Sequence, residues 1–194
     1  MEFKKLYIIG GCNGAGKTTA SFNILPELLD CKEFVNADEI ARGLSPFQPE
    51  KVSIEAGRIM LKRIEELIKS DQDFSFETTL SSRSFANTIE LAKSKGYFVT
   101  LVFFWLDSIE LAKDRVRKRV SEGGHHIDEV VIERRYKAGL KNLFHLYCQR
   151  VDSVLLYDNS NIESILIAEK EIDGNFIVHN QTKFNIIQAS LNEQ

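Results

Sequence analysis

The stretch "GCNGAGKT", residues 11–18, follows the apolar run "KLYIIG" and points to the class of fold. It matches the pattern G-x-x-x-x-G-K-[ST], in which a strand runs into a phosphate-binding loop and then into a helix. Gly14 and Gly16 permit the tight turn that aims successive backbone N–H groups at phosphate oxygens. Lys17 can reach the outer phosphates, and the Thr18 hydroxyl can ligate Mg²⁺. The stretch predicts a nucleotide site; the alternative is a glycine-rich turn without a ligand.

A second loop is expected at the same site. The segment "YDNS", residues 157–160, ends an apolar run, and in nucleotide kinases the corresponding loop borders the base. Asn159 is therefore a candidate for a nucleotide contact, with a simple Asx-turn as the alternative. The predicted nucleotide-binding residues are Gly11, Asn13, Gly14, Ala15, Gly16, Lys17, Thr18, Thr19 and Asn159.

The composition excludes several classes of protein. The 194 residues suffice for one domain with a full core, and the net charge of -3 provides no overall positive field for nucleic acid. No apolar run approaches the roughly 20 residues of a membrane span, and no cleavable signal is expected at the N-terminus. The three cysteines are far apart, which favours reduced thiols in a cytoplasmic protein over a disulfide framework or a zinc site.

Strand-like apolar runs alternate with helical segments along the chain. This order predicts a three-layer α/β fold of the P-loop NTPase or nucleotide-kinase kind, with a mostly parallel sheet of about five strands. We expect a single P-loop kinase domain over residues 1–194, with a helical lid at about 115–137. A hairpin and a short helix are expected at about 162–192. The carboxyl ends of parallel strands share one edge, so the phosphate loop should face one cleft there.

Two carboxylates are expected in that cleft. Asp38 follows the short apolar segment "EFV" and could accept a proton from an acceptor hydroxyl in line with the γ-phosphate. Capping of the next helical turn is the alternative for Asp38. Glu77 ends the strand-like "FSFE", where burial would be costly unless the carboxylate binds a ligand or forms an ion pair with a lid arginine.

The expected lid is rich in arginine. The segment "RVRKRVSEGGHHIDEVVIERRY", residues 115–136, carries five arginines on both sides of a Gly-Gly break. Arginines on a mobile lid can clamp a polyphosphate and neutralise the charge of a transition state. A solvated basic face is the alternative interpretation of the same residues.

The absence of two motifs from the sequence narrows the class of P-loop protein. The sequence has no guanine-reading N-K-x-D and no strand that ends in the Asp-Glu pair of motor ATPases. A small-molecule kinase, which mainly positions two substrates, fits these features. Two other classes stay open, a P-loop ATPase or nucleotide-binding regulatory module without a small acceptor, and a polynucleotide 5′-hydroxyl kinase. The acidic balance speaks against the last.

Four segments taken together resemble the zeta-toxin-like P-loop kinases, in particular their small stand-alone branch of predicted ATPases or kinases. They are "GGCNGAGKTT", "VNADEIA", "FETTLS" and "RVRKRVSEGGHHID…RRYKAGLKNL". The resemblance spans roughly residues 5–160. It implies ATP or GTP as the donor, Mg²⁺ as cofactor and a small-molecule acceptor, and it raises an antitoxin protein as a partner. The toxin members of this family phosphorylate UDP-N-acetylglucosamine on the sugar 3′-hydroxyl.

The resemblance also implies roles for individual residues. Asp38 would be the general base, Thr18 would hold the metal, and Lys17 would hold phosphate. The transferring phosphoryl group would be stabilised by Arg119 and Arg134. The Gly-Gly-His-His segment shifts the spacing between the arginines, so the alternatives on the same two helices are Arg115 and Arg135.

The acceptor side departs from the family pattern. Glu77 and Thr79 would hold the acceptor, by resemblance. In the best-known toxins, however, a basic-aromatic segment follows the acidic residue and helps to grip the sugar nucleotide, whereas here "EIARGLSPFQPE" follows Asp38. Arg42 in this segment is a candidate contact for an acceptor phosphate, with an exposed surface position as the alternative.

Overall fold

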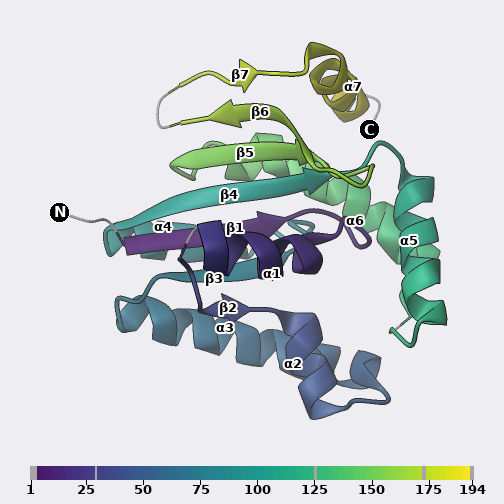
Figure 1. Ribbon diagram of the computed structural model, residues 1–194. Coiled ribbons are helices and arrows are strands. Elements are labelled where there is room, and N and C mark those ends of the chain that lie inside the picture. Colours follow the sequence, from purple (N-terminus) through teal and green to yellow (C-terminus); the bar gives the residue numbers. More distant parts are fainter. Residues whose placement is uncertain (1–3, 29, 125, 172–173, 193–194) are drawn as a thin grey trace.

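The computed structural model describes residues 4–28, 30–124, 126–171 and 174–192. Its centre is one sheet with the strand order β2-β3-β1-β4-β5-β6-β7 (Figure 1). The strands are Lys4–Gly10 (β1), Phe34–Val35 (β2), Phe74–Thr78 (β3), Tyr97–Trp105 (β4), Ser153–Asp158 (β5), Ile165–Lys170 (β6) and Ile177–Val178 (β7). The sheet of seven strands in the described ranges corrects the expectation of about five, because the C-terminal hairpin joins its edge.

The strand directions confirm a mostly parallel sheet. Strands β2, β3, β1, β4 and β5 pair in parallel, whereas β6 and β7 pair antiparallel. Residues 172–173, in the turn of the expected hairpin, lie outside the described residues. Within the parallel part, Ile9 pairs with Glu77 and Gly10 with Thr78. The phosphate loop after β1 therefore begins beside Glu77 at the carboxyl edge of the sheet.

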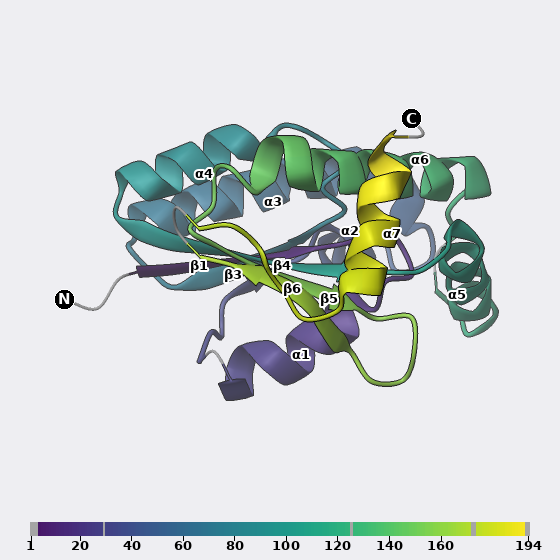
Figure 2. The ribbon, with the colours of Figure 1, turned by 90° about the horizontal axis from the view of Figure 1, so that it is seen from above.

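Helices cover both faces of the sheet and form the two outer layers of the fold (Figure 2). They are Lys17–Leu28 (α1), Ala37–Leu44 (α2), Ser53–Lys69 (α3), Phe85–Ser94 (α4), Ile109–Ser121 (α5), Glu129–Asn142 (α6) and Gln181–Asn192 (α7). A 3₁₀ turn at Pro49–Val52 precedes α3, and a π-helical turn at Leu143–Tyr147 continues α6. Figure 2 shows α3, α4 and α6 over one face, α1 over the other, and α5 beyond the carboxyl ends of the strands.

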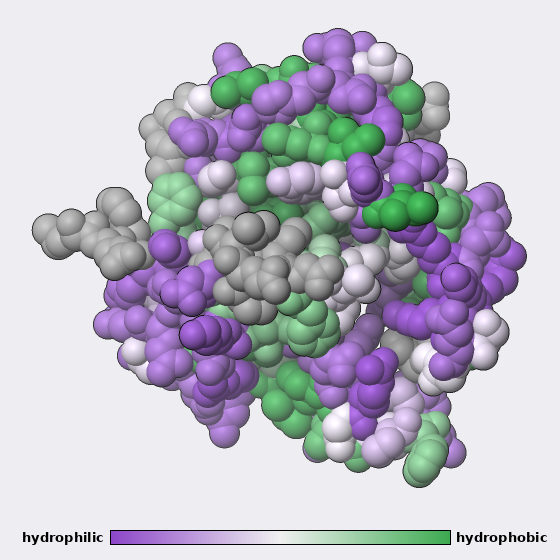
Figure 3. All heavy atoms as spheres, viewed as in Figure 1, coloured by the Kyte–Doolittle hydropathy of each residue, from purple (hydrophilic) through white to green (hydrophobic). Residues whose placement is uncertain are grey.

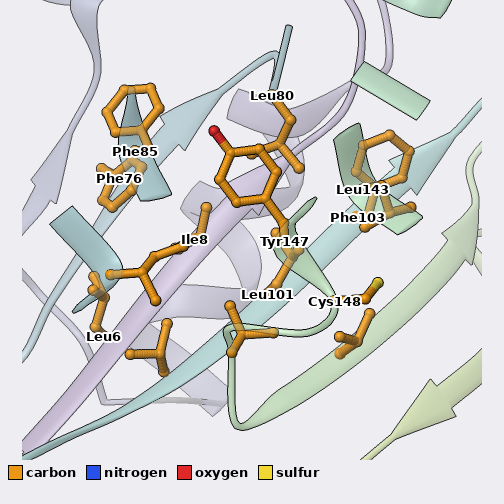
Figure 4. Close-up of a cluster of buried hydrophobic side chains, with 14 of the residues drawn as sticks. Leu6, Ile8, Phe76, Leu80, Phe85, Leu101, Phe103, Leu143, Tyr147 and Cys148 are labelled. Atoms are coloured by element: carbon orange, nitrogen blue, oxygen red, sulfur yellow. The ribbon is translucent and has the colours of Figure 1, made fainter. Parts of the chain in front are cut away.

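Strand β1 anchors the two cores. Leu6 and Ile8 lie on one face of the sheet and pack with Phe76 and with residues of α3 and α4 (Figure 4). Tyr7 and Ile9 point to the opposite face, where they belong to a second cluster that includes Ala15 of the phosphate loop and Ala112 and Val116 of α5. A strand buried on both faces needs a near-continuous apolar sequence, as "LYII" has. This packing fixes the carboxyl end of β1, from which the phosphate loop departs.

The outer surface is polar where the expected lid lies. Figure 3 shows mostly hydrophilic residues over α5. Arg117 belongs to this face, where it pairs with Asp114 at 2.8 Å and with Glu129 at 3.2 Å. Within the described ranges, none of the helices combines the length and the apolar composition that crossing a bilayer requires.

Candidate active site

The phosphate loop has a backbone conformation that its glycines allow. Gly14 and Gly16 have φ angles of +81° and +78°, in the left-handed region that favours glycine. A Cβ atom at Gly14 would lie 2.7 Å from the carbonyl oxygen of Ala112, and one at Gly16 would lie 2.6 Å from the amide nitrogen of Asn159. Neither position has room for a side chain, so the cradle depends on both glycines.

Lys17 and Glu77 form a buried pair at the start of α1. The Lys17 ammonium donates a hydrogen bond to the Cys12 carbonyl at 2.9 Å and lies 3.5 Å from Glu77 Oε1. The other carboxylate oxygen, Oε2, accepts the Thr18 hydroxyl at 2.7 Å and the Asn36 amide Nδ2 at 2.9 Å. Glu77 therefore lies against the phosphate loop, and the ion pair that compensates its burial is with Lys17 rather than with a lid arginine.

Asn36 links this cluster to Asp38. Its Oδ1 accepts the backbone N–H of Asp38 at 2.8 Å and that of Glu39 at 3.3 Å, which makes Asn36 the N-cap of α2. The alternative in which Asp38 is the cap is wrong, because Asp38 lies inside the first turn of α2. The Nδ2 of the same Asn36 side chain donates to Glu77. One amide thus connects the start of α2 to the end of β3.

A cavity of about 270 Å³, which we call the phosphate-loop cavity, lies over the loop. Its lining combines the loop with Asp38, Glu77 and two arginines of α5: Asn13, Gly14, Gly16, Lys17, Thr18, Thr19, Asp38, Glu77, Arg115 and Arg119. Three residues of the predicted nucleotide set do not line this cavity: Gly11, Ala15 and Asn159. Ala15 is fully buried, and Gly11 packs so closely on β4 that a Cβ would lie 2.5 Å from the Phe104 carbonyl oxygen.

Arg115 is held at this cavity by the loop after β5. Its Nη1 donates to the carbonyl of Asn159 at 2.8 Å, and its Nη2 donates to that of Ser160 at 2.9 Å. The Asn159 side chain donates in turn to the Ala15 carbonyl at 2.7 Å. Asn159 therefore supports the phosphate loop from behind, and the Arg115 guanidinium is fixed by two backbone carbonyls.

A larger cavity of about 400 Å³, which we call the α3 cavity, adjoins the first. Asn13, Lys17, Asp38 and Glu77 line both cavities. The remaining walls come from the start of α2, from α3, from the end of β3 and the loop that follows it, from the start of α4 and from α6: Asn36, Ala37, Ile54, Gly57, Arg58, Met60, Leu61, Thr78, Thr79, Ser82, Ser84, Phe85 and Arg135. Asp38 and Glu77 thus converge on one cleft, and Thr79 faces its larger side.

The two adjacent arginines of α6 differ in position. Arg135 lines the α3 cavity, and its Nη1 donates to Asn13 Oδ1 at 3.1 Å. Burial lowers the pKa of Arg135, whereas the nearby Asp38 carboxylate raises it and the neighbouring Arg134 lowers it further. Arg134 itself is exposed on the outside of α6. The structure therefore places Arg135, rather than Arg134, at the cleft.

The other arginines from the sequence also separate. Arg119 is half-buried on α5 and lines the phosphate-loop cavity. Arg42 is exposed at the end of α2, where it pairs with Glu39 at 2.9 Å. Of the two interpretations of Arg42, its position agrees with that of an exposed surface arginine.

The loop after β3 is held in place by α6 and the π-helical turn. A Cβ at Gly139 would lie 2.4 Å from the Thr79 carbonyl oxygen, so this glycine lets α6 approach the loop. Leu80 is fully buried with a φ of +54°, and its carbonyl accepts the Asn142 amide at 2.8 Å. The Tyr147 hydroxyl donates to the carbonyl of Ser82 in the same loop at 2.5 Å. These contacts offset the strain of a left-handed leucine.

The sequence analysis did not predict that Asn36 and the residues of α3 line the cleft. For Asn36 a signal was available, since Asn36 and Glu39 have the N-x-x-E spacing of a helix start. Gly57 gives a weaker signal as a glycine inside an amphipathic helix. A Cβ there would meet nothing within 4 Å, so packing does not require this glycine.

The sequence matches the family model described as zeta toxin over residues 2–171. The chain belongs to the zeta toxin family. The chain is 34% identical over 145 residues to a Haemophilus influenzae protein described as uncharacterized. The match covers 70% of this chain and 100% of that protein.

Solved structures share the fold of this zeta toxin family chain. One is a chain of the AvrRxo1-ORF1:-ORF2 complex with ATP, with a TM-score of 0.74 and 20% identity over 97% of this chain. The match spans 64% of the length of that AvrRxo1 chain. A second is from the PezAT toxin–antitoxin system of Streptococcus pneumoniae, with a TM-score of 0.67 and 17% identity, covering 100% of this chain and 88% of that one. Membership of the zeta toxin family supports ATP-dependent phosphotransfer in general, and the solved structures show that the fold is shared.

The residues at the phosphate loop fit the Mg²⁺ that this class implies. The Thr18 hydroxyl and the Glu77 carboxylate are hard oxygen donors 2.7 Å apart. In the described part of the chain, no group of three or more His, Cys, Asp and Glu residues forms a dedicated metal cage. An arrangement with few protein ligands suits Mg²⁺, which is usually completed by waters and substrate phosphates.

Proposed function

We propose that this zeta toxin family chain transfers the γ-phosphoryl group of ATP to a hydroxyl of a small acceptor. The acceptor occupies the α3 cavity, and a UDP-N-acetylamino sugar is the first candidate because toxins of the family act on UDP-N-acetylglucosamine. One observation carries the proposal: Asp38 lines both cavities, so a carboxylate stands where a bound donor and a bound acceptor would meet. A protein that only hydrolyses ATP has no need of the second cavity.

In the proposed reaction, Asp38 accepts the proton of the acceptor hydroxyl. The acceptor oxygen then forms a bond to the γ-phosphorus, and the bond between this phosphorus and the oxygen bridging to the β-phosphate breaks. ADP leaves with that oxygen. Lys17 and Arg119 neutralise charge on the phosphate side. Arg135 takes the role first expected for Arg134, and its contact with Asn13 supports this assignment.

We assign Glu77 to the metal side of the site. Thr18 and Glu77 would hold Mg²⁺, and the ion would neutralise charge on the β- and γ-phosphate oxygens when bound. The contacts of Glu77 with Lys17 and Thr18 support this assignment over the acceptor contact expected from the sequence. Thr79 stays a candidate for acceptor binding, and Arg42 is left out of the site.

The test is a transfer assay with labelled ATP. UDP-N-acetylglucosamine and a bacterial metabolite extract serve as acceptors, and the Asp38→Ala variant is compared with the unchanged chain. We expect label on an acceptor with the unchanged chain and at least about a hundredfold less with the variant. Label on no acceptor, together with ATP hydrolysis that the substitution leaves unaffected, would instead support a P-loop ATPase or regulatory module.

An antitoxin is a second part of the proposal. The PezAT relative is described as part of a toxin–antitoxin system, which motivates a search for a small protein encoded beside this chain. We expect such a protein to bind the chain and to suppress transfer in the same assay. Transfer that persists in a stable complex would contradict this role.

A further inference from the structure

Helix α7 lies beyond the part of the chain that matches the family. The match ends at residue 171, whereas α7 spans Gln181–Asn192. Figures 1 and 2 both place α7 towards the end of the molecule that carries α5. Ile187 of α7 is fully buried, and Phe184 packs against Phe144 and Phe176. This apolar packing fixes the helix on the kinase core.

The first turn of α7 carries a lysine that does not stabilise the helix. Lys183 is the third residue of α7, where the positive end of the helix dipole disfavours a cation. Its ammonium instead pairs with the carboxylate of Asp158 at the end of β5. The Asp158 side chain is only 1% exposed, and a buried carboxylate needs such a partner. Lys183 therefore stabilises the charge at the end of β5 and does not stabilise α7 itself.

Asp158 in turn organises the loop that follows β5. Its Oδ1 accepts the Ser160 hydroxyl at 2.5 Å and the Ser160 backbone N–H at 2.9 Å. The carbonyls of Asn159 and Ser160 receive the Arg115 guanidinium, and the Asn159 amide donates to the Ala15 carbonyl of the phosphate loop. The loop at residues 158–160 is therefore a shared support for the cradle and for an arginine of the phosphate-loop cavity.

We propose that Lys183 is a positioning residue of the nucleotide site, which acts through Asp158 and the loop at residues 158–160 on Arg115 and the phosphate loop. By this inference α7 belongs to the ATP site although it lies outside the matched region. The inference rests on the proposed use of ATP.

The charge state of Asp158 agrees with this arrangement. Burial raises the pKa of Asp158, but the Lys183 ammonium and the hydroxyl and amide of Ser160 together outweigh burial and bring the pKa below its ordinary value. The carboxylate is therefore ionised at neutral pH and attracts Lys183. Loss of Lys183 leaves this charge without its ion-pair partner and weakens the hold of α7 on the loop.

The test measures the dissociation constant of Mg·ATP by calorimetry and the melting temperature of the full chain. The variants are Lys183→Met, Lys183→Arg, and the double variant D158N/K183M, which removes the buried charge so that the fold survives. Lys170→Met is the matched control. Lys170 is likewise a partly buried lysine with a hydrogen bond, which it donates to the Cys148 carbonyl at 2.9 Å. It pairs with Val154 at the opposite end of β5 from Asp158.

We expect Lys183→Met and D158N/K183M to bind Mg·ATP about fivefold more weakly or worse, from the loss of an interaction that orders the loop. Lys183→Arg and Lys170→Met should bind within about twofold of the unchanged chain. Folded D158N/K183M that binds as tightly as the unchanged chain overturns the inference, as does equal weakening by Lys170→Met. An unchanged chain that fails to bind Mg·ATP overturns both the inference and the proposed function.

Discussion

The phosphate-loop cavity and the α3 cavity share Asn13, Lys17, Asp38 and Glu77 but are built in different ways. The first is largely local. A continuous stretch between β1 and α1 supplies the cradle, and Gly14 and Gly16 allow its conformation. The second is assembled from α2, α3, the loop after β3 and α6, which lie far apart in the sequence. A local site can be predicted from a motif, whereas an assembled one depends on tertiary contacts.

This difference suggests how the two cavities diverge between relatives. A change in the phosphate loop alters residues that also fix its backbone, so few substitutions are compatible with the fold. Changes in α3 alter a wall without disturbing the cradle. We therefore expect donor binding and acceptor binding to respond separately to mutation, and the following predictions test that separation.

The largest effect is expected from Asp38→Asn. If Asp38 is the general base, as proposed, its loss should lower kcat for transfer by about 10²- to 10⁴-fold, because proton removal is then unassisted. The dissociation constant of Mg·ATP should stay within about twofold, since the asparagine preserves the shape of the site. Calorimetry and the transfer assay measure the two quantities. The control is Glu39→Gln, the neighbouring residue that pairs with Arg42 at the surface. Equal losses of ATP binding and transfer in Asp38→Asn would show that the cavities do not function separately.

Glu77→Gln distinguishes the two assignments of this residue. If Glu77 orients the metal, the neutral amide should raise the Mg²⁺ concentration needed for half-maximal ATP binding by about 10- to 100-fold. The KM for the acceptor should change little. A fluorescent ATP analogue titrated at several Mg²⁺ concentrations measures the first quantity. A raised KM for the acceptor with an unchanged Mg²⁺ requirement would show that Glu77 binds the acceptor instead of the metal.

Gly139→Ala tests the support of the loop after β3. The added Cβ would lie 2.4 Å from the Thr79 carbonyl oxygen, so α6 or the loop must shift. We expect a loss of about 1–2 kcal/mol in the free energy of unfolding, measured in urea, and a raised acceptor KM. Mg·ATP binding should be preserved in the folded variant. Impaired ATP binding with normal acceptor affinity would contradict the separation of the two cavities.

Gly57→Ala should have the smallest effect. It should stabilise the chain, whereas Gly139→Ala should destabilise it. Alanine is the better helix former, so the free energy of unfolding should rise by about 0.5–1 kcal/mol. The new methyl group stands at the α3 cavity and should raise the KM of the acceptor found in the transfer assay. Gly43→Ala in α2 is the matched control, because a Cβ there also meets nothing within 4 Å. An equal rise in stability with no change of KM in either variant would remove Gly57 from the acceptor wall.

The sequence predicted the parts of the site that are local or that follow from topology. The glycine pattern predicted the phosphate loop. The convergence of Asp38 and Glu77 followed from their positions at the ends of parallel strands. The extent of the sheet was underestimated, because nothing local shows that a hairpin continues an existing sheet. The position of Arg135 rather than Arg134 at the cleft was also beyond local reasoning. Adjacent helical residues point about 100° apart, and only the packing of α6 decides which one faces inward.

The loop after β3 shows the same limit more sharply. Leu80 adopts a left-handed φ that its residue type does not favour, and contacts from Gly139, Asn142 and Tyr147 hold the surrounding loop. These residues follow Leu80 by roughly 60 positions or more, so no short window contains the pattern. Asn36 is different, because its spacing to Glu39 was visible as a capping signal.

The sheet ends in a two-residue strand at each edge, β2 on one side and β7 on the other. So short an edge offers few unpaired N–H and C=O groups to a strand of another molecule. The most apolar segment, "YFVTLVFFW" of β4, is paired on both sides, by β1 and β5. In the folded chain the sequence most prone to aggregation is therefore inaccessible. Aggregation on heating should begin only when the sheet itself opens, and its onset should coincide with global unfolding.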